Sequence, residues 1–381
     1  MRSKIKIVAD NKIPFLKGVL EPYADIQYLN PADITNDAVK DKDALIIRTR
    51  THCNAELLEG TDIKFIATAT IGFDHIDQEY CKEKNIKWIN APGCNSYSVQ
   101  QYIASVLLTL GHKRKLDLSG LTIGIVGVGN VGSKVEKLAK IIGMEVLLND
   151  PPRAREEGDE KFITLNELIS KSDIITFHVP LIKNGVDKTY HMADEKFFNK
   201  FAKKKIIFNT SRGQVIETNS IKNALKKKIV NGAVLDVWEN EPDIDLELLD
   251  MIDIATPHIA GYSADGKANG TSVCVRNIAS FFNLDIDKNW YPEELPAPKN
   301  SNEISIDCSD LSEQEIFYKA FISSYDILND DNTLRNSVDT FEKQRGNYPV
   351  RREFPFYKIK AKNCRNEIEN KLKEIGFQIN T

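Results

Sequence analysis

A glycine-rich turn between a strand and a helix places the strongest constraint on what this chain can fold into. The run Gly127-Val128-Gly129-Asn130-Val131-Gly132 follows the β-branched segment Thr122 to Val126 and leads into a helical pattern from Ser133 to Ile142. In a dinucleotide-binding turn, the first glycine allows the tight bend, the second lets the backbone approach the pyrophosphate, and the third allows close helix packing. We therefore expect this turn to hold a dinucleotide at the start of a helix.

An acidic residue, Asp150, ends the next predicted strand, Glu145 to Asn149. A carboxylate at this position accepts hydrogen bonds from the ribose hydroxyls and repels a 2′-phosphate, so the sequence favours NAD as the cofactor. Arg153 and Arg155 follow just beyond. Because a nearby arginine can accommodate a 2′-phosphate, NADP stays open as the alternative.

Short β-branched runs alternate with helical patterns from Ile5 to about residue 260, which predicts parallel sheets with crossover helices. Helical patterns at Asn95 to Lys115 and Ser263 to Phe282 would join two such domains. The expected fold class is α/β, with two Rossmann/flavodoxin-like parallel-sheet domains, an inter-domain cleft and a small α+β C-terminal domain. The expected bounds are 1–94 with 262–286 for substrate binding, 95–261 for NAD binding and 287–381 for the C-terminal domain.

The C-terminal eighty or so residues follow a proline-containing linker, Asp285 to Ser301. Strand-like pieces occur at Ile304 to Ile306 and at Phe377 to Ile379. Large apolar residues recur between them at helical spacing: Phe317, Phe321, Tyr325 and Leu328, then Leu334, Val338 and Phe341. A segment this small rarely buries such residues by itself, so we expect it to dock on another surface, most simply that of a second copy in a homodimer.

Three polar residues of the second domain come after successive predicted strands. Arg212 follows Ile206 to Asn209, Glu241 follows Ala233 to Val237, and His258 follows Ile252 to Ala255. Since the carboxyl ends of parallel strands face the ligand crevice, these side chains can converge on a bound nicotinamide. A histidine can take the proton of a hydroxyl, a carboxylate can orient the imidazole, and an arginine can grip a substrate carboxylate. The set predicts a dehydrogenase of hydroxy acids.

Two further positions keep two interpretations each. His178 follows another strand and either lines the cofactor or serves the structure. Arg48 and Arg50 flank Thr49 after the strand Ala44 to Ile47, where extended chain would point both arginines to one side. They form either a clamp for a substrate phosphate or a solvated loop, and Arg48 could instead belong to a structural salt bridge. Arg351 or Arg352 is a weaker phosphate candidate, with ordinary surface charge favoured.

Composition excludes several other classes of protein. With 51 basic and 55 acidic residues the net charge is −4, which argues against a dedicated nucleic-acid binder. The six cysteines show neither a CxxC pair nor metal-ligand spacing, so we expect no metal site and reduced thiols in the cytoplasm. The longest uncharged run, Ala91 to Leu110, is too polar to favour a membrane span.

Taken together, these motifs resemble the D-2-hydroxyacid dehydrogenases over roughly residues 1 to 285. The resemblance implies Arg212 and Glu241 as active-site residues, His258 as the proton-transferring group, and Thr49, Thr70 and Tyr262 as substrate contacts. Besides the glycine turn, it implies NAD contacts at Asp150, Thr210, Asp236 and Gly261, and at Val179, where family members often have a threonine. The motifs that carry it are Thr210-Ser211-Arg212-Gly213, Asp236-Val237-Trp238-Glu239-Asn240-Glu241-Pro242 and Pro257-His258-Ile259-Ala260-Gly261.

Four further segments are similar to one branch of this family, which acts on a phosphorylated substrate and carries a C-terminal dimerisation domain. They are Ala67 to Asp77, Ala91 to Asn95, His258 to Thr271 and Tyr348 to Phe354. The implied reaction is NAD-dependent oxidation of 4-phospho-D-erythronate to 2-oxo-3-hydroxy-4-phosphobutanoate in pyridoxine 5′-phosphate biosynthesis. Two alternatives stay open: a dehydrogenase for another D-2-hydroxy acid such as 3-phosphoglycerate, and an NAD-sensing, corepressor-like binding protein.

Overall fold

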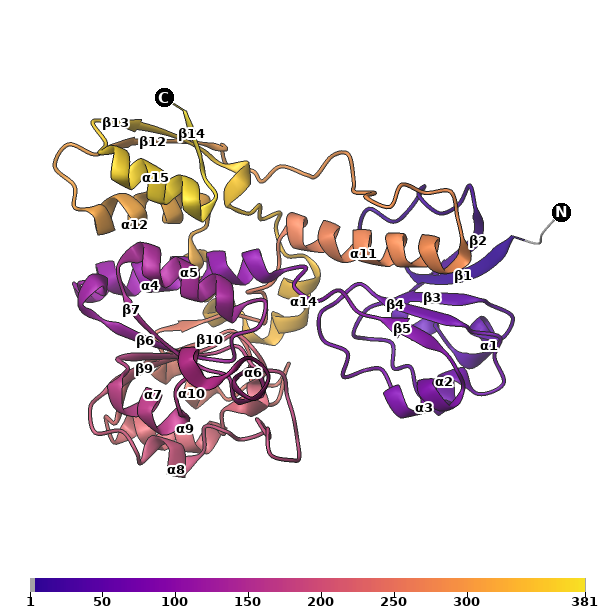
Figure 1. The fold of residues 1–381 in the computed structure, drawn as a ribbon, viewed down its shortest axis with the longest axis horizontal. Coiled ribbons are helices and arrows are strands. Elements are labelled where there is room, and N and C mark those ends of the chain that lie inside the picture. Colours follow the sequence, from indigo (N-terminus) through magenta and orange to yellow (C-terminus); the bar gives the residue numbers. More distant parts are fainter. Residues whose placement is uncertain (1–3, 381) are drawn as a thin grey trace. The chain divides into compact units, whose positions relative to one another are not determined.

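The computed structural model describes residues 4–380, which form two compact units. Unit 1 contains the residues up to 95 together with 263–296, and unit 2 contains 96–262 together with the residues from 297 onward. Figure 1 shows the ribbon with its elements labelled. By its contacts, the C-terminal segment therefore groups with the predicted NAD-binding part of the chain.

Unit 1 is built on a five-stranded parallel sheet of order β2-β1-β3-β4-β5. This is the flavodoxin-like order that the sequence predicted. The strands are β1 (Ile5–Asp10), β2 (Ala24–Leu29), β3 (Ala44–Ile47), β4 (Phe65–Thr68) and β5 (Lys87–Ile89). Strands β3 and β4 are buried over their whole length, as expected for a parallel sheet covered on both faces.

The helices of unit 1 are α1 (Asn36–Val39), α2 (Ala55–Leu58), α3 (Gln78–Glu83) and α11 (Ala264–Phe282). The predicted helix from Ser263 to Phe282 is thus confirmed. It begins where the Ser263 hydroxyl accepts a hydrogen bond from the amide of Gly266 and ends at Asn283, which has left-handed backbone angles. Its apolar face contributes Cys274, Val275 and Ile278 to the core of this unit.

Unit 2 holds a six-stranded parallel sheet of order β11-β10-β9-β8-β6-β7. Because β7 and β8 lie on opposite sides of β6, the sheet has a switch point beyond the carboxyl ends of β6 and β8, where ligands bind in open α/β sheets. The strands are β6 (Thr122–Val126), β7 (Glu145–Asn149), β8 (Ile174–Phe177), β9 (Lys205–Asn209), β10 (Val230–Leu235) and β11 (Ile254–Ala255).

Helices connect these strands, and the first of them confirms the joint predicted at Asn95 to Lys115. They are α4 (Ser96–Arg114), α5 (Gly132–Ile142), α6 (Pro151–Glu157), α7 (Leu165–Lys171), α8 (Glu195–Phe198), α9 (Thr218–Lys226) and α10 (Leu246–Met251). Helix α4 is buried on nearly all sides, polar residues included. Its polar side chains bond the C-terminal segment: Ser98 donates to Glu353, Gln101 to the carbonyl of Arg352, and Ser105 to the carbonyl of Tyr325.

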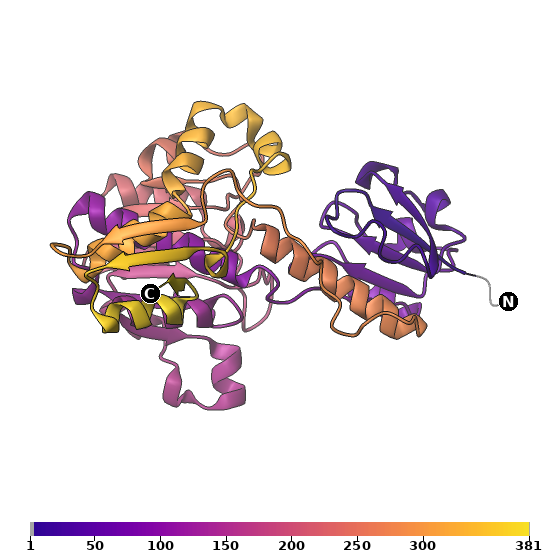
Figure 2. The ribbon, with the colours of Figure 1, turned by 90° about the horizontal axis from the view of Figure 1, so that it is seen from above.

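The C-terminal segment forms a three-stranded parallel sheet of order β12-β13-β14. The sequence predicted the outer strands but missed the central one, β13, whose alternating lysines hide its apolar positions. Figure 2 shows this sheet from above. The elements are β12 (Glu303–Asp307), α12 (Glu313–Ser324), α13 (Ile327–Asn336), α14 (Phe341–Gly346), β13 (Lys358–Lys362), α15 (Asn366–Ile375) and β14 (Gln378–Asn380).

The aromatic residues of this segment are buried within the chain itself. Phe317 and Phe321 share a hydrophobic core with α4, and Leu334 and Phe341 join the core beneath the other face of the unit 2 sheet. All four side chains are 1% exposed or less. Our reason for expecting a homodimer, that these helices need a second copy to cover them, is therefore wrong, because the nucleotide-binding part of the same chain covers them.

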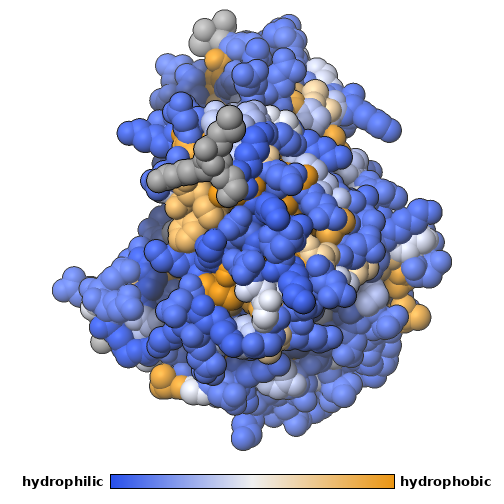
Figure 3. Space-filling model, turned by 90° about the vertical axis from the view of Figure 1, so that its right-hand side faces the viewer, coloured by the Kyte–Doolittle hydropathy of each residue, from blue (hydrophilic) through white to orange (hydrophobic). Residues whose placement is uncertain are grey.

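The surface is mostly hydrophilic on the face drawn in Figure 3, with small hydrophobic patches scattered over it. The large apolar side chains that stay exposed, such as Phe73, Val186 and Val350, come from separate segments of the chain. Within the described residues, no helix combines the length and apolar character needed to cross a bilayer.

Candidate active site

The glycine turn lies at the switch point of the unit 2 sheet, directly after β6. Gly127 has a φ of +87°, and a Cβ there would lie 2.6 Å from the carbonyl oxygen of His178. A Cβ on Gly132 would lie 2.1 Å from the carbonyl oxygen of Gly127. Both positions therefore exclude any larger residue, the first by its backbone angle as well as by contact.

The middle of the turn is open, in contrast to the crowded positions of Gly127 and Gly132. A Cβ on Gly129 would meet nothing within 4 Å, and both Gly129 and Asn130 are exposed. Val131 precedes α5, whose first turn has no side-chain cap. Open space over an uncapped helix start is the arrangement that receives a pyrophosphate, so this turn fits the phosphates of NAD.

Asp150 connects the end of β7 to the turn, because its carboxylate accepts hydrogen bonds from the amides of Val128 (2.8 Å) and Arg153 (3.2 Å). The neighbouring arginines are engaged with acids: Arg153 with Glu157 at 2.6 Å and Arg155 with Asp187 at 2.5 Å. A 2′-phosphate would have to compete with these carboxylates, which argues for NAD over NADP.

His258 and Glu241 form a hydrogen-bonded pair, with 2.7 Å between Nδ1 and Oε2. The other carboxylate oxygen, Oε1, accepts the amide hydrogen of Trp238 at 2.9 Å, which fixes the plane of the carboxylate. Burial would raise the pKa of Glu241, but the bond to His258 and the Trp238 amide outweigh it and hold that pKa below its ordinary value. Glu241 is thus an anion, which stabilises an imidazolium at His258.

The loop that carries His258 is held by Asp236, which is only 1% exposed. Its carboxylate accepts the amides of Ile259 (2.7 Å) and Ala260 (3.0 Å) and the hydroxyl of Thr256 (2.6 Å). Burial raises the pKa of Asp236 despite these bonds. The structure therefore gives Asp236 a supporting role under the catalytic loop.

Arg212 lies in the turn after β9, on a backbone that Asn209 organises. The Asn209 amide donates to the carbonyl of Arg212 at 2.9 Å, and its Oδ1 accepts the Ser211 amide and hydroxyl. A Cβ on Gly213 would lie 1.9 Å from the carbonyl oxygen of Trp238, so the Arg212 turn packs directly on the segment that leads to Glu241. Sequence reasoning missed Asn209, although an asparagine that ends an apolar strand is a signal for such a turn.

His178 lies between two threonines at the end of β8. Its Nε2 lies 3.0 Å from the Thr176 hydroxyl and its Nδ1 lies 3.3 Å from the hydroxyl of Thr210. Burial lowers the pKa of His178 to about 3, so the ring is neutral. Val179 packs beside Gly127, and Gly261 is partly exposed in the loop after His258.

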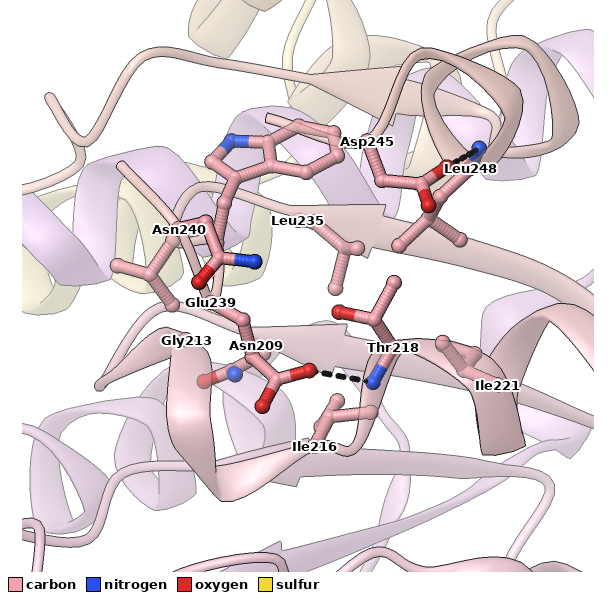
Figure 4. Close-up of a pocket in the computed structure, with 12 residues that line it drawn as sticks. Asn209, Gly213, Ile216, Thr218, Ile221, Leu235, Glu239, Asn240, Asp245 and Leu248 are labelled. Atoms are coloured by element: carbon pink, nitrogen blue, oxygen red, sulfur yellow. Dashed lines mark hydrogen bonds between the residues drawn. The ribbon is translucent and has the colours of Figure 1, made fainter. Parts of the chain in front are cut away.

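A second histidine–glutamate pair involves Glu239, the residue that follows Trp238. His191 Nε2 is 2.6 Å from Glu239, whose second oxygen accepts the amide of Thr218 at 2.8 Å. Figure 4 shows Glu239 and Thr218 among the residues that line a small pocket behind the Arg212 turn. Sequence reasoning left His191 without a role.

In unit 1, Arg48 forms a salt bridge with Asp10 from the adjacent strand. The distance from Arg48 Nε to Asp10 Oδ2 is 2.8 Å, and Asp10 is fully buried. The amide of Thr51 bonds the Arg48 carbonyl, so residues 48–51 form a turn. The expectation that extended chain points Arg48 and Arg50 to one side is therefore wrong. Arg50 and Thr49 are exposed.

The other two residues implied as substrate contacts are placed by their neighbours. The Thr70 hydroxyl donates to the carbonyl of Gly72 and lies 2.8 Å from the hydroxyl of Thr68, which in turn contacts His75. In unit 2, the ring of Tyr262 packs edge-on against Tyr348, with 5.8 Å between the ring centroids. Arg351, for which surface charge was favoured, is 5% exposed.

Comparison with known families agrees with this arrangement. Residues 100–260 match the NAD-binding domain of the D-isomer specific 2-hydroxyacid dehydrogenases. Residues 295–376 match a family described as a domain of unknown function (DUF3410).

Curated proteins resemble the chain over nearly all of its length. An erythronate-4-phosphate dehydrogenase of Bacteroides thetaiotaomicron is 52% identical over 356 residues, covering 93% of this chain and 99% of that protein. Another from Porphyromonas gingivalis is 43% identical, covering 93% and 95%.

Solved structures resemble it over about three quarters of its length. A D-lactate dehydrogenase of Aquifex aeolicus, complexed with NAD and lactic acid, has a TM-score of 0.63 and 26% identity, covering 74% of this chain and 97% of that one. An NAD⁺-bound 3-phosphoglycerate dehydrogenase of Entamoeba histolytica has the same TM-score at 24% identity, covering 75% and 98%.

Proposed function

The chain belongs to the erythronate-4-phosphate dehydrogenases among the D-isomer specific 2-hydroxyacid dehydrogenases, and from this premise we propose the reaction of its active site. It oxidises the 2-hydroxyl of 4-phospho-D-erythronate to the ketone of 2-oxo-3-hydroxy-4-phosphobutanoate, a step of pyridoxine 5′-phosphate biosynthesis. The observation that carries this proposal is the similarity over 93% of the chain to a curated enzyme of that name.

The geometry of unit 2 supports proton removal by His258. Because Nδ1 faces the Glu241 carboxylate, it carries the ring proton and leaves Nε2 as the acceptor for the proton of the 2-hydroxyl. As that O–H bond breaks, the oxygen forms the carbonyl bond and the hydrogen on C2 departs with two electrons. Bound NAD supplies the acceptor for this hydride.

Two charged side chains support the transfer. Glu241 keeps the imidazole in one tautomer and stabilises the positive charge that His258 gains. Arg212 offers a planar pair of donors to the substrate carboxylate and, through it, orients C2. We place Asp150, Thr210, Val179, Gly261 and the glycine turn at the cofactor, and Thr49, Thr70 and Tyr262 at the substrate.

A steady-state assay with 4-phosphoerythronate, 3-phosphoglycerate and lactate, each with NAD and NADP, tests the proposal. We expect the highest kcat/KM for 4-phosphoerythronate with NAD. Preference for 3-phosphoglycerate would instead support the alternative dehydrogenase. Tight NAD binding without turnover of any of the three would favour the corepressor-like binding protein.

Arg50, which is exposed in the turn after β3, is our candidate for the substrate phosphate. Arg50→Ala should raise the KM for 4-phosphoerythronate at least about tenfold, because charge-assisted hydrogen bonds contribute about 1.5 to 3 kcal/mol. Activity on unphosphorylated erythronate is the control and should change little. Equal losses on both substrates would mean that Arg50 shapes the turn and does not bind the phosphate.

We retain the homodimer as a proposal, supported by the resemblance of Tyr348 to Phe354 to a dimerisation domain. Sedimentation velocity of the full chain should give a species of twice the 43.1 kDa chain mass. A single species of chain mass at micromolar concentration would contradict it. The sequence, whose six cysteines form no CxxC pair, supports the proposed cytoplasmic location.

A further inference from the structure

Arg351 is buried next to the loop that carries His258, although it comes from the far end of the chain. Its Nη2 donates to the carbonyl oxygens of Ala260 at 2.6 Å and Ile259 at 3.4 Å. The guanidinium lies over the ring of Tyr325, with 4.4 Å to the ring centroid. A buried cation that donates to main-chain carbonyls of a loop is placed to hold the backbone of that loop.

Neighbouring residues hold Arg351 in this place. Asp330 accepts the hydroxyl hydrogens of Tyr325 (2.6 Å) and Tyr348 (2.7 Å), and its negative charge interacts with the guanidinium. Tyr348 also lies within 5.8 Å of the guanidinium and contacts the ring of Tyr262. The C-terminal segment therefore contacts both ends of the 258–262 loop.

The loop itself needs such support. His258 has a φ of +57°, in the left-handed region that non-glycine residues enter at a cost of about 1 kcal/mol or more. The two residues that follow, Ile259 and Ala260, are held through both of their main-chain groups: the N–H groups donate to the Asp236 carboxylate, and the C=O groups accept from Arg351. A buried anion and a buried cation thus fix the same stretch of backbone.

We propose that Arg351 is a positioning residue for His258, and that the C-terminal segment serves catalysis within its own chain by holding the proton-accepting loop in its strained conformation. This inference rests on the proposed function, because it assigns His258 the proton transfer. It concerns the rate of that step and leaves the cofactor turn, at the other side of the sheet, untouched.

Arg351→Met tests it, with Arg335→Met as the matched control. Arg335 also bonds main-chain carbonyls from the C-terminal segment, those of Leu249 and Ile252, and it bonds Asp331, which accepts the amide of Ala255. All of these main-chain groups come before His258 in the chain, so these bonds of Arg335 lie outside residues 258–262. Arg351→Met should lower kcat by about 10- to 10²-fold, as expected for a misplaced catalytic group. The Kd for NAD should change less than kcat does, because the glycine turn lies outside the loop that Arg351 holds. Arg335→Met should keep kcat within about twofold, although its Tm also falls.

Two milder variants keep the test decisive if Arg351→Met does not fold. Arg351→Lys retains a donor for Ala260 and should recover most of kcat, whereas Tyr348→Phe, which removes one bond to Asp330, should lose about threefold. Hydrogen–deuterium exchange at the amides of residues 258–263, a range that leaves out the Ala255 amide bonded to Asp331, should rise in Arg351→Met and not in Arg335→Met. That readout is independent of turnover, so it separates a failed inference from a failed function. Unchanged exchange and kcat in Arg351→Met, or equal kcat losses in both arginine variants, would overturn the proposal.

Discussion

Two histidine–glutamate pairs have their glutamates in the segment just after Trp238, and they are nearly the same in local geometry. His258 lies 2.7 Å from Glu241 and His191 lies 2.6 Å from Glu239. The histidine side chains are 32% and 27% exposed, and both residues have left-handed backbone angles. In each pair the second carboxylate oxygen accepts a main-chain amide. Neither distance nor burial therefore distinguishes a catalytic pair from a structural one.

The pairs differ in which ring nitrogen of the histidine faces the glutamate and in which loop carries the histidine. His258 gives Nδ1 to its glutamate, which leaves Nε2 for a substrate, and it follows a strand of the sheet at its carboxyl end. His191 gives Nε2, and its ring stacks on Tyr190 with 4.0 Å between centroids. His191 also belongs to the long connection between β8 and α8. A position at the carboxyl end of a strand of the sheet, and not the histidine–glutamate pair itself, indicates catalysis.

Replacing the catalytic imidazole should have the largest effect. His258→Asn tolerates the positive φ but has no group that titrates near neutral pH, so kcat should fall by about 10²- to 10⁴-fold. The Kd for NAD, measured by fluorescence titration, should stay within about threefold because the glycine turn is unchanged. Near-normal turnover of a folded His258→Asn protein would assign proton transfer to another group.

Removing the charge of the carboxylate should have the second largest effect. Glu241→Gln can still accept the Trp238 amide but cannot stabilise an imidazolium, so we expect kcat to fall by about 10- to 10²-fold. Glu239→Gln, the matched change in the other pair, should stay within about twofold. Similar losses in the two variants, from the same steady-state assay, would show that both carboxylates act on one proton transfer.

Much of this comparison could be predicted from the sequence. The spacing of strands, turns and helices predicts both parallel sheets. Because parallel strands align their carboxyl ends, the polar residues that follow three strands, Arg212, Glu241 and His258, are predicted to lie at the same end of the sheet. The His191–Glu239 pair could not be found this way, since its partners come from two loops whose meeting depends on how the long β8–α8 connection folds back.

The C-terminal segment was harder to predict for a related reason. Its aromatic periodicity indicates helices but says nothing about which surface covers them. Helix α4 covers Phe317 and Phe321, whereas Leu334 and Phe341 pack in the core on the other face of the sheet. The sequence signal for the contact with α4 is uncharged polar residues such as Ser98 and Gln101 in an apolar helical pattern. Arg351 likewise gives no sequence sign of burial, because the Tyr325, Tyr348 and Asp330 side chains that accommodate it come together only in the fold.

A third histidine, His75, differs from both pairs because it affects the pH dependence of stability. His75 bonds the Thr68 hydroxyl, and burial lowers its pKa to about 4. Below the unfolded pKa of about 6.5 the unfolded chain binds a proton that the folded chain does not, so stability falls as the pH drops. Between pH 7.5 and 5.5 the lowered pKa of His75 reduces the free energy of unfolding by about 1 kcal/mol. In urea unfolding over this pH range, His75→Gln should therefore lose about 1 kcal/mol less stability than the parent chain. An identical pH dependence in both proteins would contradict the buried, neutral state of His75.

The smallest effect is expected at the second pair, and it decides what the comparison means. His191→Asn keeps a residue that tolerates left-handed backbone angles and removes only a partly exposed bond to Glu239, so stability should fall by about 1 kcal/mol or less. Glu239 would still accept the Thr218 amide, and the Trp238 segment that leads to Glu241 would stay in place. The kcat for 4-phosphoerythronate should therefore remain within about twofold of the parent value. A loss as large as that of His258→Asn would mean that the two pairs act together across Trp238, and that location at the sheet edge does not separate catalysis from structure in this protein.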